Sequence, residues 1–444
     1  MLPLINDIYN GRSVFITGAT GFIGQVILEK LLYSVPSLKR VFILVRDSKS
    51  DPAPERWNQL KESILFYRVR RDCPNALDKV VVVRGDITMD NLGVSAEDEA
   101  KIVQECSIVL HIAAMIKLMD TLKNAVNLNV RGTQRVIDLS RKMKKLQCFL
   151  HCSTAYANCE LIETIERVYP LEFDAPKIIE SLDWMDDSLA EAITPALMGD
   201  KFNTYVLTKS IAENVVNDLG AEIPAVIVRP SIVTGIWRDG IRGWTFGNAS
   251  ETAFFFSSYS GMNVPVGMRN NVIDNVPVDI VSNMIIVAAA QRCLSNSSTV
   301  PVLHCASSDL NPVIQTTGFD TFSKTFNFDI RQVEWTDYLV DYFIGIKRFI
   351  ANEDVFDEEK VAAARRRLMG LCTAEYFSSL LLLFIAAVLL TGSLAPVELF
   401  SLFVALAYVP AFLLNRPFSS TPSIKSFEQY KKEQVADDTA HIVW

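Results

Sequence analysis

Three absences limit what this sequence can encode. The chain of 444 residues has no excess of positive charge, since 43 lysines and arginines stand against 51 aspartates and glutamates, giving a net charge of −8. Nonspecific nucleic-acid binding needs an accumulated positive surface, so the charge argues against a nucleic-acid partner. The eight cysteines include no CxxC pair and no zinc-ligand spacing. We therefore expect reduced structural thiols and no metal site.

The N-terminal residues also lack the features of a secretory signal, so we expect none. Residues 1–7 contain neither a basic region nor a long apolar core, and such a signal requires both. The folded part of the chain is therefore expected to face the cytosol or an organelle matrix.

A glycine-rich turn near the start of the chain is the most informative feature present, Thr17-Gly18-Ala19-Thr20-Gly21-Phe22-Ile23-Gly24. Apolar residues before it and helical spacing of apolar residues after it predict that a strand leads into a helix here. Gly18 permits the tight turn, Gly21 lets the backbone approach a pyrophosphate, and Gly24 lets the helix pack closely on the strand. In this context the turn indicates a dinucleotide site rather than an ordinary glycine turn.

The next predicted strand, residues 41–45, ends at Arg46. An NAD-preferring domain usually has an acidic residue there, which binds the ribose 2′-hydroxyl, whereas a cation suits the 2′-phosphate of NADPH. Arg46 therefore favours NADPH, although Asp47 follows it directly. The alternative is a solvated arginine at the strand end that binds no ligand.

Short apolar runs at residues 80–83, 108–112 and 149–152 alternate with helical stretches. This alternation predicts an α/β fold with a doubly wound parallel sheet of the Rossmann type. Ligands bind such sheets at the carboxyl ends of the strands. We expect Asp86 to contact adenine there, and Ala113 and Ala114 to form a floor under the cofactor.

Tyr205 and Lys209 are four residues apart, so a helix would place them on one face, one turn apart. A nearby ammonium favours the ionised form of a phenol and lowers its pKa from about 10 toward the working range. A hydroxyl from Ser153 or Thr154, at the end of the strand 149–152, would bind a carbonyl oxygen that gains charge during hydride transfer. The combination with the glycine-rich turn predicts reduction with a nicotinamide dinucleotide.

These features resemble the extended short-chain dehydrogenases/reductases and, among them, the fatty acyl-CoA reductases of the male-sterility type. The resemblance covers most of the chain up to residue 313 and resumes briefly afterwards. It is carried by residues 8–11, 44–46, 85–87, 129–133, 151–158, 203–205, Lys209, 228–233, 243–244, 276–279 and 311–312.

The resemblance implies reduction of a long-chain acyl-CoA to a primary fatty alcohol by two successive NADPH hydrides, with CoA released before the bound aldehyde is reduced. The implied catalytic residues are Tyr205, Lys209, Thr154 and Ser153. The implied NADPH site comprises Thr17, Gly18, Thr20, Gly21, Phe22, Ile23, Gly24, Arg46, Asp86, Ile87, Ala113, Ala114, Asn129, Lys209, Arg229 and Pro230. For Arg229 an internal ion pair is an equal alternative, because buried arginines are usually paired.

The chain departs from the family pattern after Asn311-Pro312. The family ordinarily has a long helical region before the counterpart of residues 328–330, and this chain has only a short connector. Residues 335–350 resemble the family's terminal helical segment and carry an apolar stripe at helical spacing. The expected organisation is a reductase domain at 1–313, a connector with the shortened helical region at 314–370, a membrane segment at 371–414 and a polar tail at 415–444.

The apolar excess of the chain lies in two runs, 376–392 without any charge and 394–414 with Glu398 alone. Each is close to the ~20 residues that span a bilayer. Four arrangements are open: a single tilted span, a two-helix hairpin, a re-entrant segment and a buried soluble hairpin. Cations on both flanks favour a membrane hairpin with both ends cytosolic. We expect attachment to the membrane of an intracellular organelle, the peroxisome or the endoplasmic reticulum, with the catalytic domain facing the cytosol.

Three functions compete on this sequence. The first is a membrane-attached fatty acyl-CoA reductase that uses NADPH, with a homo-oligomer left open. The second is another extended reductase, acting on a sterol or a sugar nucleotide. The third is a non-catalytic binding protein, suggested by the shortened C-terminal region. Intact Tyr205 and Lys209 argue against the third.

Overall fold

The computed structural model describes residues 5–118, 120–220, 222–246, 274–295 and 297–307, and seven single positions between 333 and 349. Apart from Phe349, they belong to one compact unit, Met1–Thr252 with Met268–Ile346. The expected membrane segment, 371–414, and the tail, 415–444, lie outside the described residues. Within the described ranges, no helix is both long and apolar enough to cross a bilayer.

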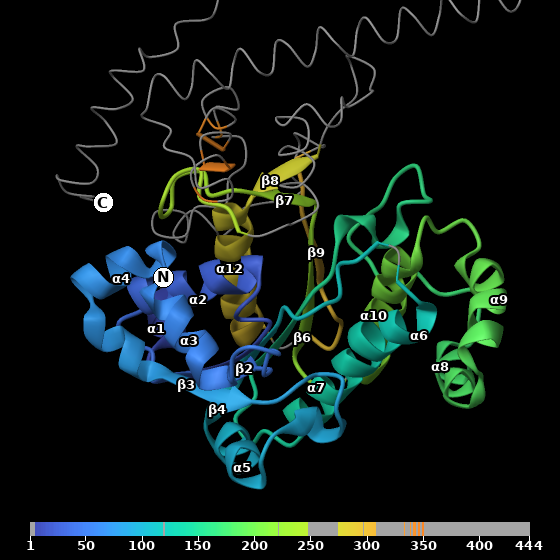
Figure 1. Ribbon diagram of the computed structural model, residues 1–444, viewed down its shortest axis with the longest axis horizontal. Coiled ribbons are helices and arrows are strands. Elements are labelled where there is room, and N and C mark those ends of the chain that lie inside the picture. Colours follow the sequence, from blue (N-terminus) through green and yellow to red (C-terminus); the bar gives the residue numbers. More distant parts are fainter. Residues whose placement is uncertain are drawn as a thin grey trace, which may run out of the picture. The chain divides into compact units, whose positions relative to one another are not determined.

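Seven parallel strands form the central sheet, in the order β3-β2-β1-β4-β5-β6-β9 (Figure 1). The strands are β1 (Ser13–Thr17), β2 (Arg40–Val45), β3 (Val80–Arg84), β4 (Cys106–His111), β5 (Cys148–Cys152), β6 (Ala225–Pro230) and β9 (Val302–Cys305). The central strands β1, β4, β5 and β6 are buried at every residue, which explains their continuous apolar runs. Strand order reverses between β1 and β4, where such sheets bind ligands. The predicted doubly wound parallel sheet is confirmed.

Helices cover both faces of this sheet. On one side α12 (Val278–Leu294) packs against α2 (Phe22–Ser34), and on the other α7 (Gly132–Arg141) lies beside α10 (Thr204–Gly220), as Figure 1 shows. Helix α12 is buried at almost every residue, because its sequence is apolar around its whole circumference. The N-terminal helix α1 (Ile5–Tyr9) docks on α12, where the Tyr9 hydroxyl donates a hydrogen bond of 2.9 Å to the carbonyl oxygen of Ile286.

Six further α-helices and a second sheet belong to the part of the chain that the structure describes. The helices are α3 (Ala53–Glu62), α4 (Tyr67–Asp72), α5 (Ala96–Glu105), α6 (Leu122–Ala125), α8 (Ala175–Trp184) and α9 (Asp187–Met198). A π-helical segment, η4 (Val126–Arg131), joins α6 to α7. Strands β7 (Ile232–Thr234) and β8 (Asn275–Pro277) pair in parallel as a second, two-stranded sheet.

The apolar stripe expected in residues 335–350 is buried at Tyr338, Tyr342 and Ile346, which are at most 1% exposed. The Tyr338 hydroxyl donates to the Thr234 hydroxyl at 2.5 Å, next to Gly235. A side chain at Gly235 would place its Cβ 2.6 Å from the Tyr342 ring. This stripe therefore packs on the chain that follows β7, and glycine is required at the contact.

Candidate active site

A cavity of about 830 Å³ lies at the carboxyl ends of the strands, across the β1–β4 switch point. Most of the predicted site residues line it. From the cofactor set these are Gly18, Thr20, Gly21, Phe22, Ile23, Gly24, Arg46, Asp86, Ile87, Ala113, Ala114 and Pro230, and from the catalytic set Ser153, Thr154 and Tyr205. Four predicted residues are not among its described lining, namely Thr17, Asn129, Lys209 and Arg229.

The glycine-rich turn is built for close backbone approach. Gly18 has a φ of 76°, and a Cβ there would lie 2.6 Å from the backbone nitrogen of Ala113. A Cβ on Gly24 would collide with the backbone of Gly18. Helix α2 begins directly after Gly21, which offers no side chain to cap the first N–H groups. Those N–H groups suit an anionic ligand such as a pyrophosphate.

A second arginine, Arg56, lines the cavity beside Arg46. The Arg56 guanidinium, from α3, donates to the Arg46 carbonyl oxygen at 2.6 Å and to the Thr20 hydroxyl at 3.1 Å. Burial, together with the positive charge of Arg46, lowers the pKa of Arg56. The neighbouring Asp47 carboxylate is instead bound by Arg84 at 2.5 Å. Two arginines therefore line the cavity here, while the adjacent Asp47 carboxylate is bound by Arg84 and by the Ala53 N–H.

Tyr205 lies in the first turn of α10, whose start is fixed by the Asn203 side chain accepting from the Val206 N–H at 2.9 Å. Lys209 follows one turn later and is buried, with its Nζ donating to the Cys152 carbonyl oxygen at 2.8 Å. Burial lowers the pKa of the Lys209 ammonium. Lys209 thus connects the end of β5 to the helix that carries Tyr205.

The two candidate hydroxyls at the end of β5 differ in what they bond. The Ser153 hydroxyl donates to the Glu213 carboxylate at 2.6 Å. The Thr154 hydroxyl donates to the Pro230 carbonyl oxygen over a long 3.4 Å. Because a hydroxyl has a single proton, Ser153 has committed its proton to Glu213. Thr154 holds a weak bond and is the better placed of the two to donate to a substrate oxygen.

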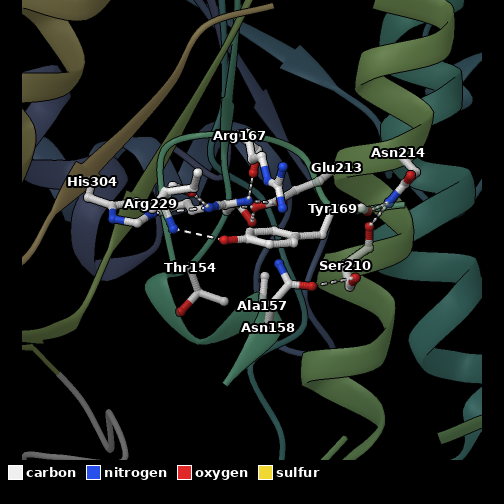
Figure 2. Close-up of polar contacts among 12 residues, drawn as sticks. Thr154, Ala157, Asn158, Arg167, Tyr169, Ser210, Glu213, Asn214, Arg229 and His304 are labelled. Carbon is white, nitrogen blue, oxygen red and sulfur yellow. Dashed lines mark hydrogen bonds and ion pairs between the residues drawn. The ribbon is translucent and has the colours of Figure 1, made fainter. Parts of the chain in front are cut away.

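Arg229 forms the internal ion pair (Figure 2). Its Nη2 lies 2.6 Å from the Glu213 Oε2, and both side chains are 1% exposed. Its other donors bond the carbonyl oxygens of Ile165 and Arg167 and the Nε2 of His304. Arg229 therefore holds Glu213 and the chain around Tyr169, behind the cavity.

Sequence reasoning missed Glu213 and Arg56. Glu213 follows Lys209 by four residues, so the same helix-face spacing that selected Tyr205 and Lys209 includes it. Arg56 had no such signal, because α3 reaches the cavity only through the turn after β2.

Polar residues, among them Lys117, Asp120, Asn203 and Ser231, also line the cavity, but most of its remaining lining side chains are apolar. The apolar side chains include Met115, Ile116, Leu118, Leu128, Phe202, Val206, Ile232 and Val233. Three of them are substantially exposed, Ile116 at 55%, Leu118 at 45% and Phe202 at 82%. A wall of this kind binds a hydrocarbon chain better than a polar sugar.

Comparisons with known proteins agree with this site. The family model described as "Male sterility protein" matches residues 16–285. Fatty acyl-CoA reductase 1 of Pongo abelii is 31% identical over 91% of this chain and 97% of the relative. Solved structures at a TM-score of 0.50 include the reductase domain of a non-ribosomal peptide synthetase from Mycobacterium tuberculosis, 20% identical over 82% of this chain and 76% of that one.

UDP-glucuronic acid 4-epimerase from Bacillus cereus, solved in complex with NAD, has the same TM-score, with 16% identity over 77% of this chain and 99% of that one. At such identities the two structures show a shared fold alone. The family match and the sequence identity to Fatty acyl-CoA reductase 1 go further. This chain belongs to the family of male sterility proteins and fatty acyl-CoA reductases, and it is a reductase with a nicotinamide cofactor.

Proposed function

We propose that this protein uses NADPH to reduce a long-chain fatty acyl-CoA to a primary alcohol through a bound aldehyde. The observation that carries the proposal is one cavity in which Tyr205 and Thr154 lie between the glycine-rich turn and an apolar wall. The family relation supports the acyl-CoA substrate.

The residues present fit a dinucleotide. The glycines at 18 and 24 leave no room for a Cβ, and the α2 N-terminus offers N–H groups to the pyrophosphate. The choice of NADPH over NADH rests on the guanidinium groups of Arg46 and Arg56, since a 2′-phosphate binds arginine through charge-assisted hydrogen bonds. When bound, NADPH supplies a hydride.

Tyr205 and Thr154 serve the carbonyl carbon that accepts this hydride. Their hydroxyls donate hydrogen bonds to the thioester oxygen, which becomes an oxyanion as the carbon–hydrogen bond forms. Collapse of this tetrahedral adduct breaks the carbon–sulfur bond and releases the CoA thiolate, leaving an aldehyde. In the second reduction, which consumes a second NADPH, Tyr205 transfers its proton to the alkoxide. Lys209 lies one turn away and favours the phenolate that results.

The direct test is incubation of the purified full-length protein with NADPH and a panel of acyl-CoA chain lengths, with products identified by mass. A primary alcohol, with free CoA released in equal amount, is the expected product. An aldehyde that accumulates without alcohol would overturn the second reduction, and unchanged acyl-CoA at every length would overturn the proposal.

Membrane attachment through residues 371–414, at a peroxisome or the endoplasmic reticulum, is part of the same proposal and rests on composition. A hairpin would keep the catalytic domain and the C-terminus on the cytosolic side. Protease treatment of sealed microsomes that carry doubly tagged protein tests this. Both tags should be digested, and a protected C-terminal tag would instead indicate a single span.

A further inference from the structure

A chain of buried side chains runs from the cofactor wall toward the catalytic helix. The Ala113 N–H donates to the Thr17 hydroxyl at 3.3 Å, and this hydroxyl lies 2.7 Å from the His111 Nδ1. The His111 Nε2 lies 3.0 Å from the Thr133 hydroxyl, which in turn donates to the Asn129 carbonyl oxygen at 2.7 Å. Thr17, His111 and Thr133 are at most 1% exposed.

The two ends of this chain determine its direction. Thr133 donates its single proton to the Asn129 carbonyl oxygen at 2.7 Å, so in this arrangement its oxygen accepts from the His111 Nε2–H. Burial lowers the pKa of His111 to about 3, so the ring is neutral and its Nδ1 is an acceptor. Thr17 therefore donates to Nδ1 and accepts from the Ala113 N–H. Every hydrogen position between Ala113 and Asn129 follows from these constraints.

The Asn129 side chain extends the connection to the catalytic helix. Its Oδ1 accepts from the Met115 N–H at 2.8 Å, and its Nδ2 donates to the Thr208 hydroxyl at 3.0 Å. The single Thr208 hydroxyl proton faces the carbonyl oxygens of Thr204 and Tyr205, which lie 2.8 and 3.1 Å from Oγ1. Asn129 belongs to the π-helical segment η4, and such segments occur frequently at functional sites.

We propose that His111 is a positioning residue which, as the Nε2–H tautomer and through the Thr17 hydroxyl, couples the cofactor wall at Ala113 to the helical turn that carries Tyr205. The inference rests on the proposed function for the role of Tyr205, but the coupling itself concerns cofactor binding. Reversal of the His111 tautomer would require Thr133 to give up its bond to the Asn129 carbonyl oxygen, so a disturbance at either end is transmitted to the other.

The tautomer is tested by NMR on full-length protein with ¹⁵N-labelled histidine. The chain has four histidines, and the His111 signals are assigned by elimination with variants at the other three. A neutral ring protonated on Nε2 at pH 7 is expected. A ring protonated on Nδ1, or an imidazolium, would overturn the proposal without any reference to catalysis.

The coupling is tested by a double-mutant cycle on the dissociation constant of NADPH, or of NADH if that dinucleotide binds more tightly. Thr17→Val and Thr208→Val each remove one hydroxyl, and three residues of the hydrogen-bonded path lie between these two positions. Each single variant should weaken binding about 5- to 10-fold. The dissociation constant of the double variant should be at least threefold lower than the value expected if the two single effects multiplied. The reason is that a hydrogen-bonded chain already broken at one end no longer depends on its other end.

A buried hydroxyl outside the chain provides the matched control. Ser140 on α7 donates to the Val136 carbonyl oxygen at 2.7 Å and is 1% exposed. The effects of Thr17→Val and Ser140→Ala on the dissociation constant should multiply to within about twofold, as the effects of independent sites do. Thr17→Ser keeps the hydroxyl and should restore near-normal affinity. Multiplicative behaviour of Thr17→Val with Thr208→Val would refute the coupling, whereas inactivity of the wild type toward acyl-CoA would refute only the proposed function.

Discussion

The neighbouring hydroxyls of Ser153 and Thr154 allow the proposed mechanism to be tested by paired substitutions. If Thr154 donates to the substrate oxygen, Thr154→Val removes one donor to the developing oxyanion. Losses of this kind lower kcat about 100- to 1,000-fold. Ser153→Ala removes no donor from the cavity, because the Ser153 proton is bound to Glu213 at 2.6 Å. Its kcat should stay within about tenfold of the wild type.

Stability should show the opposite order. Ser153→Ala removes a hydrogen bond to a buried carboxylate, and such bonds contribute about 1.5–3 kcal/mol. The Glu213 Oε1 still accepts from the Arg229 Nε at 2.8 Å, which favours the lower end of this range. Thr154→Val removes two long bonds, the one of 3.4 Å to the Pro230 carbonyl oxygen and the one of 3.3 Å that its hydroxyl accepts from the Tyr156 N–H as a helix N-cap. Its free energy of unfolding should therefore fall by about 1 kcal/mol.

The assay is aldehyde reduction followed by NADPH absorbance, which isolates the second hydride step, combined with urea unfolding of the same preparations. The reasoning predicts one variant that is stable and slow and another that is less stable and fast. If Ser153→Ala is the slow variant and Thr154→Val is not, the Ser153 hydroxyl turns toward the substrate and the assignment made from the Glu213 contact is wrong.

Three further predictions follow from the site. Tyr205→Phe should lower turnover at least about 100-fold while NADPH affinity stays nearly unchanged, because only the proton donor is lost; unchanged turnover would contradict its role as the acid. Arg56→Ala should weaken NADPH binding about 10- to 100-fold and NADH binding far less. As the control, Arg84→Ala removes a partner of Asp47 and should change the binding of both dinucleotides little. Equal losses for both dinucleotides in Arg56→Ala would mean that Arg56 contacts no 2′-phosphate. Burial lowers the pKa of His111 to about 3 and that of His304 to about 4, so between these values and about 6.5 the unfolded chain binds more protons than the folded one. From pH 7 to 5.5 the free energy of unfolding should fall by about 1 kcal/mol for the buried His111. The loss should be smaller for His304, which is partly exposed to solvent. Urea unfolding across this range measures the loss, and a flat profile would mean that these rings are protonated in the folded protein.

Local patterns were sufficient wherever one element determines a feature. The glycine-rich turn, the apolar runs of the central strands and the Tyr205–Lys209 spacing were visible because each depends on neighbours within a few residues. The stripe through Tyr338, Tyr342 and Ile346 was visible for the same reason. Parallel pairing followed from the alternation of strands and helices.

The failures concern side chains whose partners lie far away in the sequence. Arg229 fitted the cofactor set equally well until Glu213, 16 residues earlier, was found 2.6 Å away. The sequence did not show whether Ser153 or Thr154 donates to the substrate oxygen, because this depends on which of the two hydroxyls bonds the Glu213 carboxylate. Arg56 was invisible, since only the path of the chain after β2 brings α3 beside Arg46.

Sequence by itself therefore determined the class of fold, the dinucleotide turn and the helix that presents Tyr205 and Lys209, because those depend on backbone geometry and periodicity over short distances. Tertiary structure alone decided which polar atoms remain available to a ligand. A hydroxyl has one proton and a guanidinium a limited set of donors, and burial forces each to find a partner. Whether that partner is another side chain or the substrate depends on contacts between strands and helices that are distant in the sequence.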